Sequence, residues 1–216
     1  DALTDGKAIE IQPKHAGAYN NLGAVFKELG KHKKSITCFQ KAIEIQPKHA
    51  DAYNNLGNVL QDLGELQKAI NCYEKTIQIN PNYVNAHYNI GTVFKQLGET
   101  QKAIDCFQTV IQIKPDRVED AHVSLGLIFK ELGEPQKAIS CYEKAINIKP
   151  DYTQAYSNIL FTLFYLEEND PKYYFSQTKK FISSLEPINN DLLLKYQFES
   201  RPKKLKIGFV SGDFRQ

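Results

Sequence analysis

The sequence contains no methionine and no tryptophan, and its formal net charge at pH 7 is only +2. Its lysines are spread evenly, so it lacks the clustered positive charge with which proteins bind nucleic acid. It also lacks an apolar run of the roughly 18 residues that a membrane-spanning helix needs. We therefore expect neither a nucleic-acid partner nor a membrane partner. Because a natural chain begins with methionine, we also expect these 216 residues to be a piece of a longer protein.

What the sequence does have is internal repetition with a period of about 34 residues. Prolines and two sets of glycines keep this register: Pro13, Pro47, Pro81, Pro115 and Pro150; Gly23, Gly57, Gly91 and Gly126; Gly30, Gly64, Gly98 and Gly133. Within one unit, an apolar stripe at helical spacing runs from Tyr53 to Leu63, and a second follows from Leu66 to Ile77. A glycine separates the stripes and a proline ends the second. Each unit therefore predicts two antiparallel helices, and the pairs must stack to bury both apolar faces.

The repeated positions inside each unit are small or aromatic. Gly57 and Ala69 are expected where the two helices approach closely, since a bulky side chain there would push them apart. The whole pattern resembles the tetratricopeptide repeat family. The matching residues of the first two units are Tyr19, Leu22, Gly23, Phe26, Ser35, Phe39, Ala42 and Pro47, then Tyr53, Leu56, Gly57, Leu60, Ala69, Tyr73, Thr76 and Pro81. The resemblance implies an all-α fold, a right-handed tetratricopeptide-repeat α-solenoid.

The repeat frame divides the chain into five parts. Residues 1–15 are the expected remnant of a preceding repeat helix, and residues 16–152 hold four full repeats. Residues 153–198 hold the first helix of a fifth repeat and the helices that cap it. A linker at 199–204 then leads to residues 205–216, a short strand-like segment that we interpret as the start of a truncated α/β domain.

The fifth first helix is unusually apolar. It places Phe161 and Phe164 at positions where the first repeat has Ala24 and Lys27. Since such positions normally face solvent, we expect another part of the chain to cover them. The next predicted helix, about residues 171–185, and the apolar segment 191–198 are the expected cover.

Cysteines and histidines do not predict a metal site or a disulfide. The four cysteines, Cys38, Cys72, Cys106 and Cys141, recur once per repeat. Equivalent positions in adjacent repeats are roughly 8–10 Å apart, whereas a disulfide needs Cα atoms within about 7 Å. We interpret them as packing thiols of a reducing, cytoplasmic protein. No histidine pair has metal-ligand spacing, and no nucleophile or phosphate-binding motif occurs, so we expect no catalytic, cofactor-binding or metal-binding residue in this chain.

The asparagines are different. Two residues before the first glycine of successive repeats stand Asn21, Asn55 and Asn89, then Ser124, and Asn158 occupies the matching position in the fifth first helix. In a tetratricopeptide solenoid the first helices line the concave face, so the resemblance implies a ladder of amides there. An amide both donates and accepts hydrogen bonds, so it can hold the backbone of an extended peptide. We predict Asn21, Asn55, Asn89 and Asn158 to be peptide-binding, with a tolerated surface residue as the alternative. A basic clamp for acidic peptide ends is disfavoured, because no lysine stands beside the ladder.

The last residues carry a second resemblance. The stretch from Lys204 to Phe214, KLKIGFVSGDF, is similar to the start of the catalytic region of the O-linked N-acetylglucosamine transferases and their SPINDLY-like relatives, glycosyltransferase family 41. The family's histidine would follow Gln216, so we expect the chain alone to be inactive. The resemblance implies that a longer parent enzyme uses a nucleotide sugar, UDP-N-acetylglucosamine or a fucose donor.

Together these resemblances imply a protein-binding arm that recruits polypeptide substrates for such a glycosyltransferase. The expected partners are extended polypeptide segments of client proteins on the concave face. Self-association through the cut ends of the solenoid is also possible on this interpretation, because stacked repeats expose apolar faces where the stack ends. The alternative is a stand-alone tetratricopeptide scaffold that assembles a protein complex.

Overall fold

A computed structural model describes residues 15–113, 118–164, 166 and 171–185. These residues form ten α-helices and no strand. The helices are α2 (Ala16–Glu28), α3 (His32–Ile45), α4 (Ala50–Asp62), α5 (Leu66–Ile79), α6 (Val84–Gln96), α7 (Thr100–Ile113), α8 (Val118–Glu131), α9 (Pro135–Ile148), α10 (Thr153–Phe164) and α11 (Pro171–Leu185). The predicted remnant helix, the segment 191–198, the linker and the terminal strand lie outside the described residues, and the five-part division stays a prediction.

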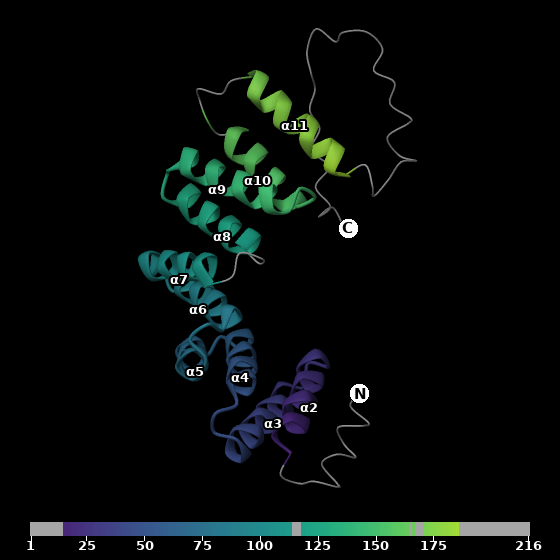
Figure 1. Ribbon diagram of the computed structural model, residues 1–216, viewed down its shortest axis with the longest axis vertical. Helices are drawn as coiled ribbons and strands as arrows, with labels where there is room; N and C mark the ends of the chain where they lie inside the picture. Colours follow the sequence, from purple (N-terminus) through teal and green to yellow (C-terminus); the bar gives the residue numbers. More distant parts are fainter. Residues whose placement is uncertain (1–14, 114–117, 165, 167–170, 186–216) are drawn as a thin grey trace.

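The helices pack as antiparallel pairs that stack along one direction. Each first helix packs against the second helix of its own pair, and each second helix also packs against the first helix of the next pair. Figure 1 shows the stack as a curved array from α2 to α11, with the even-numbered first helices on the inside of the curve. The all-α solenoid that the period predicted is confirmed.

Glycines with positive φ follow the first helix of each of the first four pairs. Gly30, Gly64, Gly98 and Gly133 have φ values of 68°, 75°, 75° and 73°, a left-handed conformation that residues with a Cβ rarely adopt. At the second of these turns, the Gly64 N–H donates to Gln61 O at 2.9 Å. The bond satisfies one carbonyl at the end of α4, and the chain reverses into α5.

The other set of glycines lets an aromatic ring sit against the first helix. A Cβ added to Gly57 would lie 2.6 Å from Cε1 of Tyr73, which is far inside van der Waals contact. Tyr73 is completely buried, and Phe39, Phe107 and Tyr142 occupy the same place in the other repeats. The predicted close approach at Gly57 is confirmed. Its partner is an aromatic ring of the second helix.

Two small polar residues replace alanine in the repeat pattern, and both are fully buried with a hydrogen bond. Ser35 Oγ donates to Gly23 O at 2.7 Å, and Thr76 Oγ1 donates to Cys72 O at 3.0 Å. Because each hydroxyl donates a hydrogen bond to a backbone carbonyl, the solenoid tolerates polar atoms at these core positions.

The first helices of the first two repeats are capped by histidine. His15 Nδ1 accepts from the Ala18 N–H at 2.9 Å, and His49 Nδ1 accepts from the Ala52 N–H at 3.4 Å. Each ring occupies the residue before its helix and satisfies one of the unpaired N–H groups there. These histidines therefore have a structural role in the turn between repeats.

The fifth repeat departs from the others. The predicted helix after α10 is present as α11, and it packs against the face of α10 that carries Tyr156, whose ring lies 6.2 Å from that of Phe181. Phe161 and Phe164 lie on another side of α10 and stay 52% and 62% exposed. The expectation that α11 buries these two side chains is wrong, because they point to a different side of α10 from Tyr156. The other expected cover, the segment 191–198, lies outside the described residues.

Candidate functional site

The inner side of the curve is formed by the first helices of the repeats (Figure 1). The first helix α4 contacts both α2 and α6 directly, although a second helix separates each pair in sequence. Equivalent side chains of neighbouring first helices therefore lie close enough to interact. The residues of the predicted asparagine ladder belong to these first helices, and we call the inner surface of the first helices the concave face.

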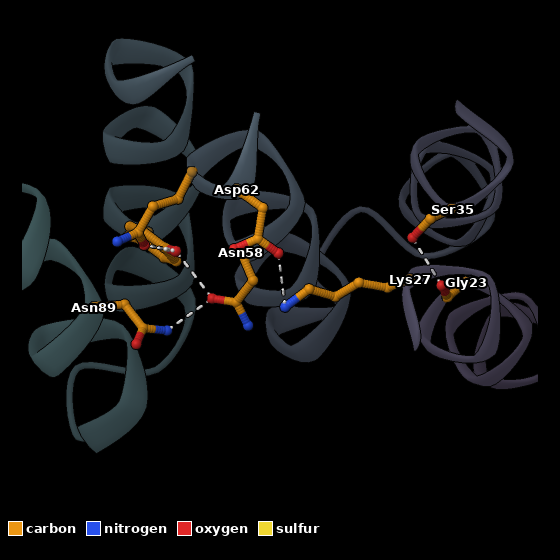
Figure 2. A network of polar contacts seen from close by, with 8 residues as sticks. Gly23, Lys27, Ser35, Asn58, Asp62 and Asn89 are labelled. Atoms are coloured by element: carbon orange, nitrogen blue, oxygen red, sulfur yellow. Dashed lines mark hydrogen bonds and ion pairs between the residues drawn. The ribbon is translucent and has the colours of Figure 1, made fainter. Parts of the chain in front are cut away.

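The asparagines of neighbouring repeats bond to one another. Asn55 Nδ2 donates to Asn20 Oδ1 at 3.0 Å, which links α4 to α2. Asn89 Nδ2 donates to Asn54 Oδ1 at 3.2 Å and to Asn58 Oδ1 at 2.8 Å, which links α6 to α4. Figure 2 shows the bond between Asn89 and Asn58. Two of the predicted ladder amides, Asn55 and Asn89, therefore hold consecutive repeats together.

A buried tyrosine supports the middle of this network. The Tyr73 hydroxyl lies 2.9 Å from Asn58 Oδ1 and 2.8 Å from Gln61 Oε1, so its single proton is shared between two amide oxygens. Gln61 Nε2 then donates to Thr92 Oγ1 of the next repeat at 3.2 Å. The ring that packs on the glycine of α4 thus also fixes the amide side chains of the concave face.

A hollow of about 390 Å³ opens between α4 and α6 on this face. Its walls include five asparagines, the side chains of Tyr83 and Tyr88, and the carboxylate of Asp120; the asparagines are Asn54, Asn55, Asn58, Asn85 and Asn89. Asn54 is only 4% exposed, Asn85 is exposed, and the other three amides are partly exposed.

Some amide atoms of the hollow remain available. Within the part of the chain that the structure describes, the Nδ2 atoms of Asn54 and Asn58 donate no hydrogen bond. The Oδ1 atoms of Asn55 and Asn89 likewise accept none there. The hollow therefore presents both donors and acceptors to whatever enters it, as the backbone of an extended peptide requires.

The charged and phenolic groups around the hollow have partners. Tyr83 OH donates to Asp51 Oδ1 at 2.6 Å, and both burial and this bond raise the pKa of Tyr83. On the other side of the concave face, Lys27 Nζ lies 3.2 Å from Asp62 Oδ2, as Figure 2 shows, and Lys95 Nζ lies 3.0 Å from Glu131 Oε1. Each of these pairs joins adjacent repeats, and an acid neutralises each of the two lysines.

The predicted ladder is not continuous. Asn55 and Asn89 lie together in the hollow, whereas Asn21 is exposed on the first described helix. Asn158 belongs to α10, beyond Ser124 of the intervening repeat, and its Nδ2 atom is buried without a hydrogen-bond partner among the described residues. The structure thus brings two of the four predicted residues together.

Sequence reasoning missed Asn58, which is central to the network. Its oxygen accepts from both Asn89 and Tyr73. The signal was available, since residue 58 stands four positions after Asn54 and therefore on the same side of α4. Other repeats have no asparagine at this position, and the repeat frame therefore did not single it out.

The cysteines are free thiols that pack between helices. Burial raises the pKa of Cys72 and of Cys106 to about 11, so both are almost wholly protonated near neutral pH. In the described ranges, no group of three or more His, Cys, Asp or Glu side chains could hold a metal ion. The chemistry of the concave face is therefore that of hydrogen-bonding amides.

Three overlapping stretches of the chain, residues 14–82, 49–116 and 83–151, match the sequence profile of the tetratricopeptide repeat. Together they span well over half of the sequence. The chain belongs to the tetratricopeptide repeat family. As a tetratricopeptide repeat protein it is a scaffold for protein–protein interaction, and its paired helices, turn glycines and concave face are those of the family's solenoid.

Solved structures of other tetratricopeptide repeat proteins are similar to this one. A MamA protein is 26% identical, with a TM-score of 0.68 over 87% of this chain and 98% of that one. YrrB is 23% identical, with a TM-score of 0.65 over 90% of this chain and 96% of that one. PilF of Pseudomonas aeruginosa is 18% identical, with a TM-score of 0.69 over 80% of this chain and 75% of that one. The last two likenesses concern the fold alone. No curated protein sequence matches the chain. Among the described helices, none has the length and apolar character to cross a membrane.

Proposed function

We propose that this tetratricopeptide repeat protein binds extended polypeptide segments along its concave face, and that Asn21, Asn55, Asn89 and Asn158 contact the bound backbone. The observation that carries the proposal is the amide-lined hollow between α4 and α6, which contains Asn55 and Asn89. Its available amide donors and acceptors come from neutral side chains, and the carboxylate in its wall, Asp120, already accepts a hydrogen bond from the Tyr152 hydroxyl. The amides therefore favour a backbone over any one charged side chain. YrrB, which shares the fold, is described as a tetratricopeptide repeat protein with an unusual peptide-binding site.

Neutral amides suit a surface with many clients. An extended backbone offers one N–H and one C=O per residue whatever its sequence. A carboxylate or lysine at the same place would instead select for charge, and Lys27 and Lys95 of this face are already paired with acids. The proposal therefore predicts affinity for many unrelated segments and a weak dependence on salt.

The test replaces Asn55 and Asn89 together with alanine and measures binding of a fluorescein-labelled panel of unrelated 16-residue peptides. Two neutral hydrogen bonds contribute about 1–3 kcal/mol, so we expect affinity to fall roughly 5- to 150-fold for every peptide that binds. Asn71→Ala is the matched control, because Asn71 is an exposed asparagine on the second helix α5. If the double variant binds the whole panel with unchanged affinity, these asparagines connect neighbouring repeats and do not bind peptide.

The stability of each variant must be measured beside its affinity. Asn89→Ala leaves the oxygen of the nearly buried Asn54 without its donor, which costs about 1–3 kcal/mol. Asn55→Ala removes a bond to the partly exposed Asn20, and water can replace it there. We expect Asn89→Ala to melt at a lower temperature than Asn55→Ala. Below both melting transitions, at 20 °C, both variants should keep wild-type helicity by circular dichroism.

A second candidate function rests on the segment from Lys204 to Phe214, which is similar to the start of a family 41 catalytic region. In that case the concave face recruits polypeptide acceptors for a nucleotide-sugar glycosyltransferase in the longer protein. The test is transfer of sugar from UDP-N-acetylglucosamine or a fucose donor by the longer protein, with and without the Asn55 and Asn89 substitutions. If the longer protein transfers sugar from neither donor, the glycosyltransferase role is refuted and the stand-alone scaffold is the remaining hypothesis.

A further inference from the structure

The concave face changes its chemistry along the array. One residue after the packing glycine, or after Leu160 in α10, the five first helices carry Ala24, Asn58, Thr92, Leu127 and Phe161. Three residues further on they carry Lys27, Gln61, Lys95, Lys130 and Phe164. Both series are polar or small near the N-terminal end and aromatic at the C-terminal end. The face therefore has an amide-lined part on α4 and α6 and an apolar part on α10.

The two phenylalanines of α10 are exposed at this end, 52% for Phe161 and 62% for Phe164. They stand where α4 has Asn58 and Gln61, which belong to the amide network. Exposed aromatic rings at neighbouring positions of one helix face are unfavourable in water and favourable when a ligand covers them. This apolar part therefore continues the surface on which the amide hollow lies.

The charge beside these rings is also distinctive. Lys27 and Lys95 at the equivalent position form ion pairs with Asp62 and Glu131 of the next repeats. Lys130 Nζ instead lies 4.8 Å from the centroid of the Phe161 ring. No carboxylate of the described residues is within ion-pair distance of it. This part of the face thus joins exposed aromatic carbon to a positive charge that has no carboxylate partner among the described residues.

We propose that Lys130, Phe161 and Phe164, which we call the Phe161 patch, anchor an aromatic or large aliphatic side chain that stands next to an aspartate or glutamate in the bound polypeptide. The apolar side chain covers the two rings, and the neighbouring carboxylate pairs with Lys130. Burial of the rings supplies the affinity, and charge complementarity selects the residue beside the anchor. The inference rests on the proposed function and names the client class for the same concave face.

The spacing of the helices sets the length of the client segment. The first helices α2, α4 and α6 are in contact with one another in succession, and packed helices lie about 10 Å apart, so we assign each repeat an advance of about 10 Å along the face. From Asn89 on α6 to Phe161 on α10 is two repeats, or about 20 Å, and an extended peptide covers this distance in about six residues. A client therefore needs a backbone-bound stretch and an apolar–acidic pair about six residues from it.

The experiment compares labelled 16-residue peptides by fluorescence anisotropy. The host peptide contains only Gly, Ser, Thr and Gln, and two derivatives carry one Phe–Asp pair about six residues to either side of the middle. Covering the rings with one phenylalanine should raise the affinity of one derivative about tenfold over the host. A third peptide replaces the aspartate of the better derivative with lysine, and we expect it to lose part of that gain.

The protein variants come from the array itself. Phe161→Asn with Phe164→Gln places in α10 the residues that α4 carries at the same positions, and both side chains are exposed, so the fold should be retained. We expect this double variant to lose the tenfold gain and to bind the host peptide as before. Lys130→Gln should remove the preference for aspartate over lysine. Phe175→Gln is the matched control, because Phe175 is a 68% exposed phenylalanine of α11 outside the patch.

The outcomes separate the inference from the proposed function. If the host peptide binds and depends on Asn55 and Asn89, but the Phe–Asp pair adds nothing, the Phe161 patch is not an anchor and the backbone site stands. The inference also fails if the gain survives in the Phe161→Asn, Phe164→Gln variant. If neither the host nor its derivatives bind, both proposals are overturned. A gain that disappears only in the patch variants supports the anchor.

Discussion

A single methyl group at two equivalent glycines should have opposite effects on stability. Gly57 and Gly91 occupy the same position in the second and third repeats, and each faces the aromatic ring of its second helix. A Cβ at Gly57 would meet Tyr73 at 2.6, 2.9 and 3.0 Å. At Gly91 the nearest atoms, of Cys106 and Phe107, are 3.1, 3.1 and 3.2 Å away. Alanine therefore overlaps its neighbour severely at one site and only slightly at the other.

The magnitude follows from two opposing terms. Replacing glycine by alanine inside a helix stabilises it by about 1 kcal/mol. Overpacking costs about 1–3 kcal/mol when the neighbour cannot move. Tyr73 cannot move easily, because it is fully buried and its hydroxyl is held by Asn58 and Gln61. With the overpacking cost at the upper end of its range for the 2.6 Å approach, we expect Gly57→Ala to lose up to about 2 kcal/mol, and Gly91→Ala to be neutral or slightly more stable.

The assay is urea unfolding at 25 °C followed by the helical circular dichroism signal, with both variants beside the wild type. A double variant, Gly57→Ala with Tyr73→Leu, should lose less than the sum of its single substitutions, because leucine leaves room for the added methyl group. Equal losses in Gly57→Ala and Gly91→Ala, or a Gly57→Ala protein more stable than the wild type, would refute the packing argument.

Two further predictions concern titratable groups. Burial and the nearby Lys144 lower the pKa of His122, so the unfolded chain takes up a proton there more readily and the wild type loses stability as pH falls below about 6.5. His122→Tyr introduces the residue that the second repeat has at this position, Tyr53. This variant should lose less stability than the wild type between pH 7 and pH 5, and an identical shift in melting temperature for the two proteins would contradict this. Burial raises the pKa of Cys72 and Cys106 to about 11, against a usual 9.0, so their labelling by a disulfide reagent at pH 8 should be about a hundredfold slower than for free cysteine. Labelling of all four thiols at the free rate in the folded protein would show that opening motions expose them.

Much of the fold was predictable because each repeat encodes its own helix pair. The turn at Gly64 and the close approach at Gly57 are local features, and both are present as expected. The solenoid itself follows from the period, since stacked equivalent pairs are the only way to bury both apolar faces of every unit.

The contacts between repeats were less predictable. The sequence pointed to Asn55 and Asn89 as surface amides, but it did not indicate that Asn89 would bond to Asn54 and Asn58 of the preceding repeat. Those bonds depend on the distance and rotation between neighbouring first helices, and the period of the sequence sets neither. The packing of α11 was missed for the same reason. The sequence marked Phe161 and Phe164 as unusual without specifying which side of α10 the next helix would contact.

The sequence by itself therefore determined the helix pairs, their turns and the small residues at their contacts, because these depend on neighbours within about one repeat. Only the tertiary structure decided which amides pair with one another, which remain available in the hollow between α4 and α6, and that the rings of Phe161 and Phe164 stay exposed. The physical reason is that these features come from the angle at which successive pairs stack. Many small packing contacts along the array together set that angle.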